Sequence, residues 1–192
     1  MIAILKYNAG NVTSVKNTVE RLGYQCIITD DPKLLAYADK VIFPGVGQAA
    51  TAMEYLKAKG LDTVIKSLTQ PVLGICLGMQ LMCNSTSEGN TEGLGIFDIE
   101  VKKFPPDEIV PHMGWNTLNI KGSKLFKNIP TDAHFYFVHS YYAEMSKYAI
   151  AECSYILPYS AVLEKDNFYA VQFHPEKSGV FGEILIKNFL EL

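Results

Sequence analysis

The sequence predicts an α/β protein, a single domain in which helices flank an open, mostly parallel but mixed sheet. In the first half of the chain, short runs rich in β-branched residues alternate with segments of helical spacing, which is the order of βαβ units. In the second half, strand-like runs follow one another directly. A length of 192 residues suits one hydrophobic core, so we expect a single domain over 1–192.

The first half is expected to alternate strands with helices. The predicted strands are 2–7, 25–29, 40–43 and 72–75, and the predicted helices are 12–22, a short one from Asp31-Pro32, 49–59, 61–68 and 77–83. Asn11 can cap the first helix, whose apolar residues follow helical spacing until Gly23. Asp31 before Pro32 is typical of a helix start, and Gly60 is typical of a helix end.

The second half is expected to begin with a loop and to continue as strands. The polar, glycine-bearing stretch 84–95 is the predicted loop. The predicted strands are 99–104, 115–120, 135–142, 149–156, 160–165 and 168–173. A last helix over 181–190 carries an apolar face that can cover the sheet.

Composition excludes several functional classes. With 48% hydrophobic and 19% charged residues, the chain is neither disordered nor fibrous. A net charge of −3 provides no basic excess for nucleic acid. No apolar run approaches the roughly 20 residues of a membrane span, and the first residues lack the pattern of a signal peptide. We therefore expect a cytoplasmic protein that binds neither nucleic acid nor membranes.

The segment Gly74-Ile75-Cys76-Leu77-Gly78 has the form G-x-C-x-G at a predicted strand-to-helix junction. This is the sulfur counterpart of the serine elbow of hydrolases, in which a sharp turn presents a nucleophile and flanking glycines avoid clashes. The helix N-terminus favours a thiolate, and the Leu77 N–H can face a developing oxyanion. The alternative is a buried thiol between packing glycines, so the motif needs support from elsewhere in the chain.

That support is Phe173-His174-Pro175-Glu176, which directly follows an apolar strand. In an extended segment, residues two positions apart point the same way, so His174 and Glu176 share a face. A carboxylate beside an imidazole fixes its tautomer and raises its basicity. We therefore expect Cys76 as nucleophile, His174 as base and Glu176 as the group that orients it.

Two further segments are candidates for binding at the same site. The loop Pro44-Gly45-Val46-Gly47 follows a strand, and its backbone N–H groups could assist Leu77 at the oxyanion, although a simple turn is the alternative. Gln80 lies four residues after the cysteine and can face the same opening. The segment His139-Ser140-Tyr141 could hold the charged groups of an amino acid on a backbone edge.

We expect no metal, no cofactor and no disulfide. The four cysteines, Cys26, Cys76, Cys83 and Cys153, lie far apart without the spacing of a zinc site. A structural role is expected for His112, His134 and His139, because they match no ligand spacing with the cysteines.

Together these motifs resemble the class I, triad-type glutamine amidotransferases along the whole chain. The resemblance implies their flavodoxin-like fold. Other segments resemble, within that family, the glutaminase subunits of imidazole glycerol phosphate synthases: Y-N-A-G-N over 7–11, P-H-M-G-W-N over 111–116, Y-F-V-H-S-Y over 136–141 and E-K-S-G over 176–179. Met79 and Lys177 depart from the anthranilate synthase glutaminases, which usually have C-L-G-H-Q and H-P-E-S.

The resemblance implies hydrolysis of L-glutamine through a cysteine thioester. It also implies transfer of the ammonia to a (β/α)₈ barrel cyclase, the heterodimer partner that makes imidazole glycerol phosphate in histidine biosynthesis. The oxyanion residues would be Gly45, Val46 and Leu77, and the glutamine contacts would be Gly47, Gln80, Ser140 and Tyr141. The partner interface would include Asn11, Met113, Trp115, Tyr136 and Lys177.

Other functions remain open at this stage. Asn8 and Ile109 depart from the residues that family members commonly have. A paralogue that supplies ammonia to a sugar or anthranilate-type synthase is therefore an alternative. A cysteine hydrolase that is not an amidotransferase would reuse the same turn. A non-catalytic binding subunit is a third alternative, which the intact Cys76, His174 and Glu176 disfavour.

Overall fold

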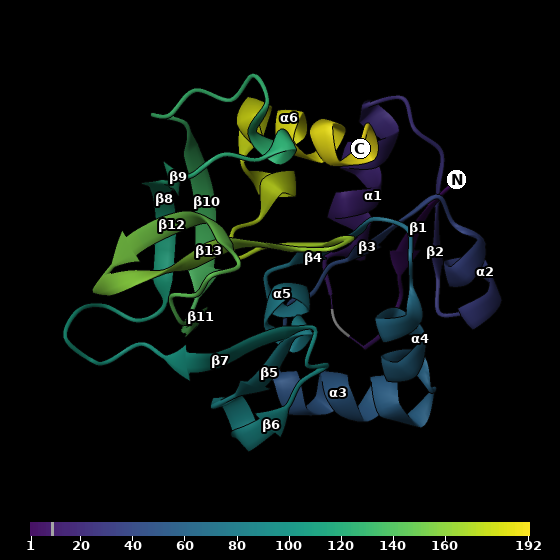
Figure 1. Ribbon diagram of the computed structural model, residues 1–192, viewed down its shortest axis with the longest axis horizontal. Coiled ribbons are helices and arrows are strands. Elements are labelled where there is room, and N and C mark those ends of the chain that lie inside the picture. Colours follow the sequence, from purple (N-terminus) through teal and green to yellow (C-terminus); the bar gives the residue numbers. More distant parts are fainter. Residues whose placement is uncertain (9) are drawn as a thin grey trace.

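The structure is a computed structural model that describes residues 1–8 and 10–192 (Figure 1). Ala9, one residue of the Y-N-A-G-N motif, lies outside the described residues. In the described part of the chain, 12 strands form one sheet with the order β2-β1-β3-β4-β14-β13-β11-β7-β5-β6, which β12 and β9 extend beside β13. This open mixed sheet, flanked by helices, confirms the predicted α/β class.

One half of the sheet is parallel. It consists of β1 (Ile2–Leu5), β2 (Cys26–Thr29), β3 (Lys40–Phe43), β4 (Val72–Ile75) and β14 (Phe168–Val171). Every pair of neighbours among these strands runs in the same direction. Their carboxyl ends therefore meet along one edge, where open α/β sheets place their ligands.

Helices cover both faces of this parallel half. They are α1 (Val12–Arg21), α2 (Pro32–Tyr37), α3 (Ala49–Ala58), α4 (Leu61–Ser67), α5 (Leu77–Met82) and α6 (Gly179–Leu190). Figure 1 shows α1 and α6 on one side of the sheet, with α3 and α5 on the other. Alternation along β1 explains the two layers, because Ala3 and Leu5 join the cluster of α3 and α5, whereas Ile2 and Ile4 join that of α1 and α6.

The other half of the fold is mainly antiparallel. Its strands are β5 (Cys83–Thr86), β6 (Thr91–Glu92), β7 (Phe97–Lys103), β8 (His112–Thr117), β9 (Asn119–Ile120), β10 (His134–His139), β11 (Tyr141–Ala143), β12 (Ala149–Tyr155) and β13 (Leu157–Lys165). β8 and β10 pair with each other as a separate two-stranded ribbon.

The predicted loop over 84–95 is wrong. The chain forms β5 as soon as α5 ends at Met82, makes a 3-10 turn at Glu88–Asn90 and returns as β6. β5 pairs in parallel with β7, from Cys83 opposite Phe97 onward. Pairing with β7 makes this polar segment a strand, and the polar composition of 84–95 alone does not reveal that pairing.

Two predicted strands are each divided. The stretch 115–120 belongs to β8 and β9, and 135–142 belongs to β10 and β11. The second break, at Ser140, is where the chain leaves its β8 partner and pairs with β7 instead. After this break, Ser140 and Tyr141 line the same pocket as Cys76.

The predicted helix start at Asp31 is confirmed, since its side chain accepts a hydrogen bond from the Lys33 amide at 2.8 Å. The predicted capping role of Asn11 is wrong. Asn11 has a left-handed backbone, and its side chain makes no capping bond to α1 but donates to the Glu176 carboxylate. None of the helices found in the described residues combines the length and apolar character that crossing a membrane requires.

Candidate active site

The turn between β4 and α5 holds Cys76 in a strained backbone conformation, with φ 52° and ψ −106°. The two neighbouring glycines allow other parts of the chain to approach closely. A Cβ on Gly78 would lie 1.9 Å from the carbonyl oxygen of Phe43, and a Cβ on Gly74 would lie 3.0 Å from the Met79 amide nitrogen. The turn therefore requires both glycines of G-x-C-x-G and presents the thiol at the carboxyl edge of the sheet.

Replacing Gly78 by alanine is expected to destabilise the fold, because the new Cβ would meet the backbone of β3 rather than a movable side chain. We expect a loss of roughly 2–4 kcal/mol in the free energy of unfolding, measured by urea denaturation. Gly10→Ala is the matched control, since its Cβ would meet only a methyl of Val46, at 3.1 Å. Equal losses in the two variants would contradict this role for Gly78.

His174 and Glu176 form a buried pair just beyond β14. His174 precedes a 3-10 turn at Pro175–Lys177, and its Nδ1 lies 2.8 Å from Oε1 of Glu176. The side chains are 1% and 0% exposed. Asn11 donates to the same Oε1. A buried carboxylate that is hydrogen-bonded in this way fixes the orientation of the imidazole. The expected contact forms, although a 3-10 turn and not the extended segment assumed from the sequence brings the two side chains together.

The parallel pairing of β14 with β4 brings the pair to the cysteine. Val171 lies opposite Ile75, and the Cys76 amide donates to the carbonyl oxygen of Val171 at 2.8 Å. The segment that follows Val171 therefore leaves the sheet at the same edge as Cys76. Sheet order thus explains how a turn in the first half of the chain meets a segment near its end.

The pKa of His174 reflects its two neighbours. Burial by itself lowers this pKa, because it disfavours the charged ring. The hydrogen bond to Glu176 and the interactions with the Cys76 sulfur outweigh burial and raise the pKa of His174 to about 10. Glu176 holds Nδ1, and Nε2 has no hydrogen-bond partner among the described residues, so Nε2 is the ring atom available to the thiol proton. The ring can therefore hold a proton at neutral pH.

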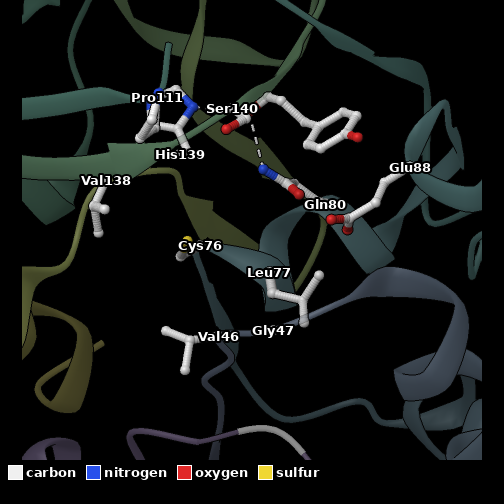
Figure 2. Close-up of a pocket in the computed structure, with 11 residues that line it drawn as sticks. Val46, Gly47, Cys76, Leu77, Gln80, Glu88, Pro111, Val138, His139 and Ser140 are labelled. Carbon is white, nitrogen blue, oxygen red and sulfur yellow. Dashed lines mark hydrogen bonds between the residues drawn. The ribbon is translucent and has the colours of Figure 1, made fainter.

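A pocket of about 390 Å³ opens at Cys76 (Figure 2). This volume lies within the roughly 300–1,000 Å³ typical of small-molecule sites. Figure 2 shows Val46 and Gly47 on one side of Cys76, and His139 and Ser140 on the opposite side. The described lining consists of Val46, Gly47, Cys76, Leu77, Gln80, Glu88, Pro111, Val138, His139, Ser140 and Tyr141.

All four residues predicted to contact glutamine line this pocket: Gly47, Gln80, Ser140 and Tyr141. Nε2 of Gln80 donates to the carbonyl oxygen of Tyr141 at 3.0 Å, which links α5 to the chain break before β11. Gly47 has φ 123°, a conformation that favours glycine, so the loop before α3 can pass close to the opening. The structure thus gathers the predicted contacts at the Cys76 thiol.

The predicted oxyanion residues Gly45, Val46 and Leu77 also meet at the cysteine. The Leu77 amide does not point into free space, because it donates to the carbonyl oxygen of Gly45 at 3.2 Å. The preceding residue is held too, since the Tyr7 hydroxyl donates to the Pro44 carbonyl at 2.7 Å. In this conformation the Leu77 N–H, which a developing oxyanion would need as a donor, is already hydrogen-bonded to the Gly45 carbonyl.

Several of the residues predicted to dock a partner contact or adjoin the segment of His174 and Glu176. Met113 and Trp115 are 66% and 56% exposed on β8, and Trp115 packs edge-on against Tyr136 of β10. The backbone carbonyl of Tyr136 accepts from the His174 amide at 2.9 Å. Asn11 bonds to Glu176, and Lys177 follows it in the chain. The surface and the buried pair are therefore directly connected.

Comparison with known proteins decides the family. The family model described as glutamine amidotransferase class-I matches residues 4–192. The chain is a class I glutamine amidotransferase. The imidazole glycerol phosphate synthase subunit HisH of Bacteroides fragilis is 59% identical to this amidotransferase over 194 residues, with 100% of this chain and 99% of the relative covered.

Further relatives agree in name and in fold. HisH of Escherichia coli is 46% identical, again with 100% of this amidotransferase and 99% of the relative covered. A crystal structure of a glutamine amidotransferase superposes with a TM-score of 0.77 at 18% identity, over 99% of this chain and 97% of that one. At this identity the superposition shows a shared fold.

Two polar residues of the amidotransferase site were missed from the sequence. Glu88 lines the pocket, and its Oε2 accepts from the amide of Ala49 at the start of α3 at 2.9 Å. It lies in the stretch predicted as a loop. Gln172 is fully buried beside Cys76. An amide between apolar residues just before His174 was a signal that could have found it.

The remaining histidines are placed as follows. His112 and His139 are buried, with Nδ1 of His112 at 3.3 Å from Nε2 of His139, whereas His134 is exposed. Burial lowers the pKa of His139 to about 3 and that of His112 to about 4, so both rings are neutral. Within the described residues of the amidotransferase, no three His, Cys, Asp or Glu side chains are grouped closely enough to hold a metal ion.

Proposed function

We propose that this amidotransferase is the glutaminase subunit of an imidazole glycerol phosphate synthase and that it hydrolyses L-glutamine at Cys76, His174 and Glu176. The observation that carries this proposal is the buried His174–Glu176 pair beside a thiol that opens to a pocket. Full-length identity of 46–59% with proteins named as the HisH subunit of that synthase supports the assignment within the family.

The reaction follows from the positions of the three groups. The Cys76 thiol gives its proton to Nε2 of His174, and the thiolate attacks the side-chain carboxamide carbon of glutamine. The C–N bond breaks as the imidazolium donates its proton to the departing ammonia, which leaves a glutamyl thioester on Cys76. His174 then takes a proton from water, and the resulting hydroxide attacks the thioester carbon. The C–S bond breaks, glutamate is released, and the imidazolium returns its proton to the Cys76 sulfur. Glu176 holds the ring throughout.

The pocket suits an amino acid. Its described lining carries one carboxylate, Glu88, and neither lysine nor arginine. The carboxylate can pair with the α-ammonium of glutamine, and the carbonyl of Gln80 can accept from the same group. Ser140 and the neighbouring backbone can bind the α-carboxylate, and Gly47 leaves room for the substrate to enter. A phosphorylated acceptor would find no cation among these residues, so we place its reaction on another chain.

The other chain is proposed to be a (β/α)₈ barrel cyclase that docks as a heterodimer partner on Asn11, Met113, Trp115, Tyr136 and Lys177. Ammonia in neutral water is mostly protonated and is then a poor nucleophile, so it needs a passage protected from solvent. Exposed aromatic and methionine side chains are typical anchors of protein interfaces. The cytoplasmic location expected from the sequence stays a prediction.

Docking is also expected to control the rate. Because the Gly45 carbonyl occupies the Leu77 amide, the free chain lacks an open oxyanion site. The peptide between Gly45 and Val46 must turn before its own N–H can face the substrate. Such a loop is a two-state element that a partner can bias. The isolated subunit should therefore waste little glutamine.

Glutaminase rates test both the function and this restraint. We expect the complex with cyclase and bound acceptor to release glutamate at least about 100-fold faster than the free chain, the size of effect that one oxyanion donor supplies. The measurement compares the free chain, the complex, and the complex with acceptor, by coupled detection of glutamate. Equal rates in all three would refute the restraint, and no glutamate release from any of them would refute the function.

A further inference from the structure

Gln172 connects the nucleophile to the substrate-binding amide of Gln80. It is 0% exposed and lies between β14 and His174. Its Nε2 donates to the Cys76 sulfur over 3.7 Å, and its Oε1 accepts from Nε2 of Gln80 at 3.0 Å. A buried amide costs stability unless both of its ends are bonded, and here both ends point to residues of the reaction site.

The direction of these hydrogen bonds is fixed by their partners. Nε2 of Gln80 also donates to the carbonyl oxygen of Tyr141, which can only accept. The same Nε2 of Gln80 also lies within hydrogen-bond distance of the Gln172 amide, so Gln80 donates its second amide proton to Gln172. The oxygen of Gln172 therefore faces Gln80, and its NH₂ group faces the sulfur.

The Tyr141 carbonyl that anchors this chain of bonds is itself held. Nδ1 of His139 lies 2.7 Å from the same oxygen, and Nε2 of His139 lies 3.2 Å from the hydroxyl of Tyr159. Both the His139 ring and Tyr159 are buried. The amides of Gln80 and Gln172 are thus pre-oriented by packed groups rather than by solvent.

We propose that Gln172 is a catalytic hydrogen-bond donor that stabilises the Cys76 thiolate, and that Gln80 couples this donor to bound glutamine. This inference rests on the proposed function. A sulfur anion accepts a stronger hydrogen bond than a neutral thiol, so the donor favours transfer of the thiol proton to Nε2 of His174. Once the C–S bond has formed, the sulfur is neutral and this bond weakens.

Gln80 provides the coupling because its two amide protons are already used. Among the described residues nothing donates to its Oε1, which remains free to accept from the ammonium group of glutamine. That contact polarises the Gln80 amide and strengthens its donation to Gln172. The Gln172 amide in turn becomes a stronger donor to the sulfur, so a filled pocket favours the thiolate.

The Gln172 amide does not titrate, but several titratable groups lie near the Cys76 sulfur. His174 and, through it, Glu176 lie beyond β14, and Tyr7 lies beyond β1. Glu88, His139 and Tyr141 line the same pocket. Each of these groups is unchanged when Gln172 is replaced, so a change in the titration of Cys76 would report the lost donor.

The test is the pH profile of Cys76 alkylation by iodoacetamide, followed by mass spectrometry of the peptide that contains Cys76. Gln172→Met keeps the length of the side chain and removes the donor, so the alkylation midpoint should rise by about one pH unit. Gln172→Glu keeps the shape and places a carboxylate oxygen at the sulfur, so its midpoint should rise further. Gln70→Leu removes a partly buried amide hydrogen bond, from Gln70 to the carbonyl oxygen of Leu35, and should leave the midpoint unchanged.

A midpoint that stays in place in a folded Gln172→Met or Gln172→Glu variant would overturn the proposal. If neither variant folds, the native chain still tests it, because the side-chain NH₂ resonances of Gln172 should titrate together with Cys76. Gln172 NH₂ chemical shifts that do not change as Cys76 ionises would also overturn the proposal. Alkylation needs no substrate turnover, so failure here is distinct from failure of the glutaminase function.

Steady-state kinetics separate the two amides in the complex. Gln172→Met should lower kcat about 10-fold with KM for glutamine within about twofold, because Gln172 bonds to the sulfur and to Gln80 and does not itself line the pocket. Gln80→Leu should chiefly raise KM, because it removes a substrate contact. The reverse assignment of kcat and KM effects would contradict the division of roles.

Discussion

Cys76→Ala is expected to abolish use of glutamine by the complex and to leave its ammonia-driven synthesis intact. Without the sulfur there is no acceptor for the glutamyl group, so kcat for glutamine should fall by about 10⁴-fold or more. The cyclase reaction with added ammonium salt should keep its rate, because the acceptor site lies on the other chain. The measurement is product formation from each nitrogen source at pH 8.5, where part of the ammonium is deprotonated.

Cys26→Ala is the matched control, because Cys26 is a partly exposed free thiol on the edge strand β2, remote from the pocket. It should leave both rates unchanged. Loss of ammonia-driven synthesis in Cys76→Ala would mean that the substitution damages docking or folding. Retention of glutamine-driven synthesis would contradict the assignment of the nucleophile.

Glu176→Gln is expected to reduce kcat/KM for glutamine by about 10²–10⁴-fold. The amide keeps the volume but removes the charge that orients the His174 ring and holds its proton. The amide introduced at position 176 can either donate to or accept from Nδ1 of His174, so it no longer selects one tautomer of the ring. Glu183→Gln is the control, because it removes a partly exposed carboxylate that pairs with Arg21 and should leave kcat/KM unchanged.

The pH profile gives the sign of the Glu176 effect. In the native chain the pKa of His174 is raised to about 10, so the imidazolium that donates a proton to ammonia is lost only as the pH rises toward that value. Glu176→Gln removes one of the interactions that raise this pKa. The alkaline limb of kcat/KM should therefore move to lower pH, and a limb that stays in place would contradict the role of Glu176.

The three residues of the candidate catalytic site could be selected from the sequence because their signals are local. G-x-C-x-G needs two glycines where Phe43 and Met79 approach, and His174 and Glu176 share a face of one short segment. The contact between the two segments could not be read from the sequence, because it depends on the parallel pairing of β14 with β4 that the structure shows. Local chemistry was enough to select the residues, whereas the strand order that joins them came from the structure.

The missed features depend on partners distant in the sequence. Residues 84–95 looked like a loop, but β5 gains its order from β7 and so places Glu88 at the pocket. The break at Ser140 follows from a change of strand partner. The Gly45 carbonyl accepts a hydrogen bond from the Leu77 amide. A glycine-rich loop can adopt more than one peptide orientation, so the sequence could not show which one forms. Gln172 looked like one more strand residue.

Labelling with a diazo-ketone analogue of glutamine tests most directly whether this sulfur is the nucleophile. The complex with cyclase is incubated with the analogue, and its peptides are then read by mass spectrometry while the remaining activity is measured. We predict one label, on Cys76, with loss of glutaminase activity in proportion and protection by glutamine. A label on Cys26, Cys83 or Cys153 that abolishes activity, or full activity after complete labelling of Cys76, would contradict the account.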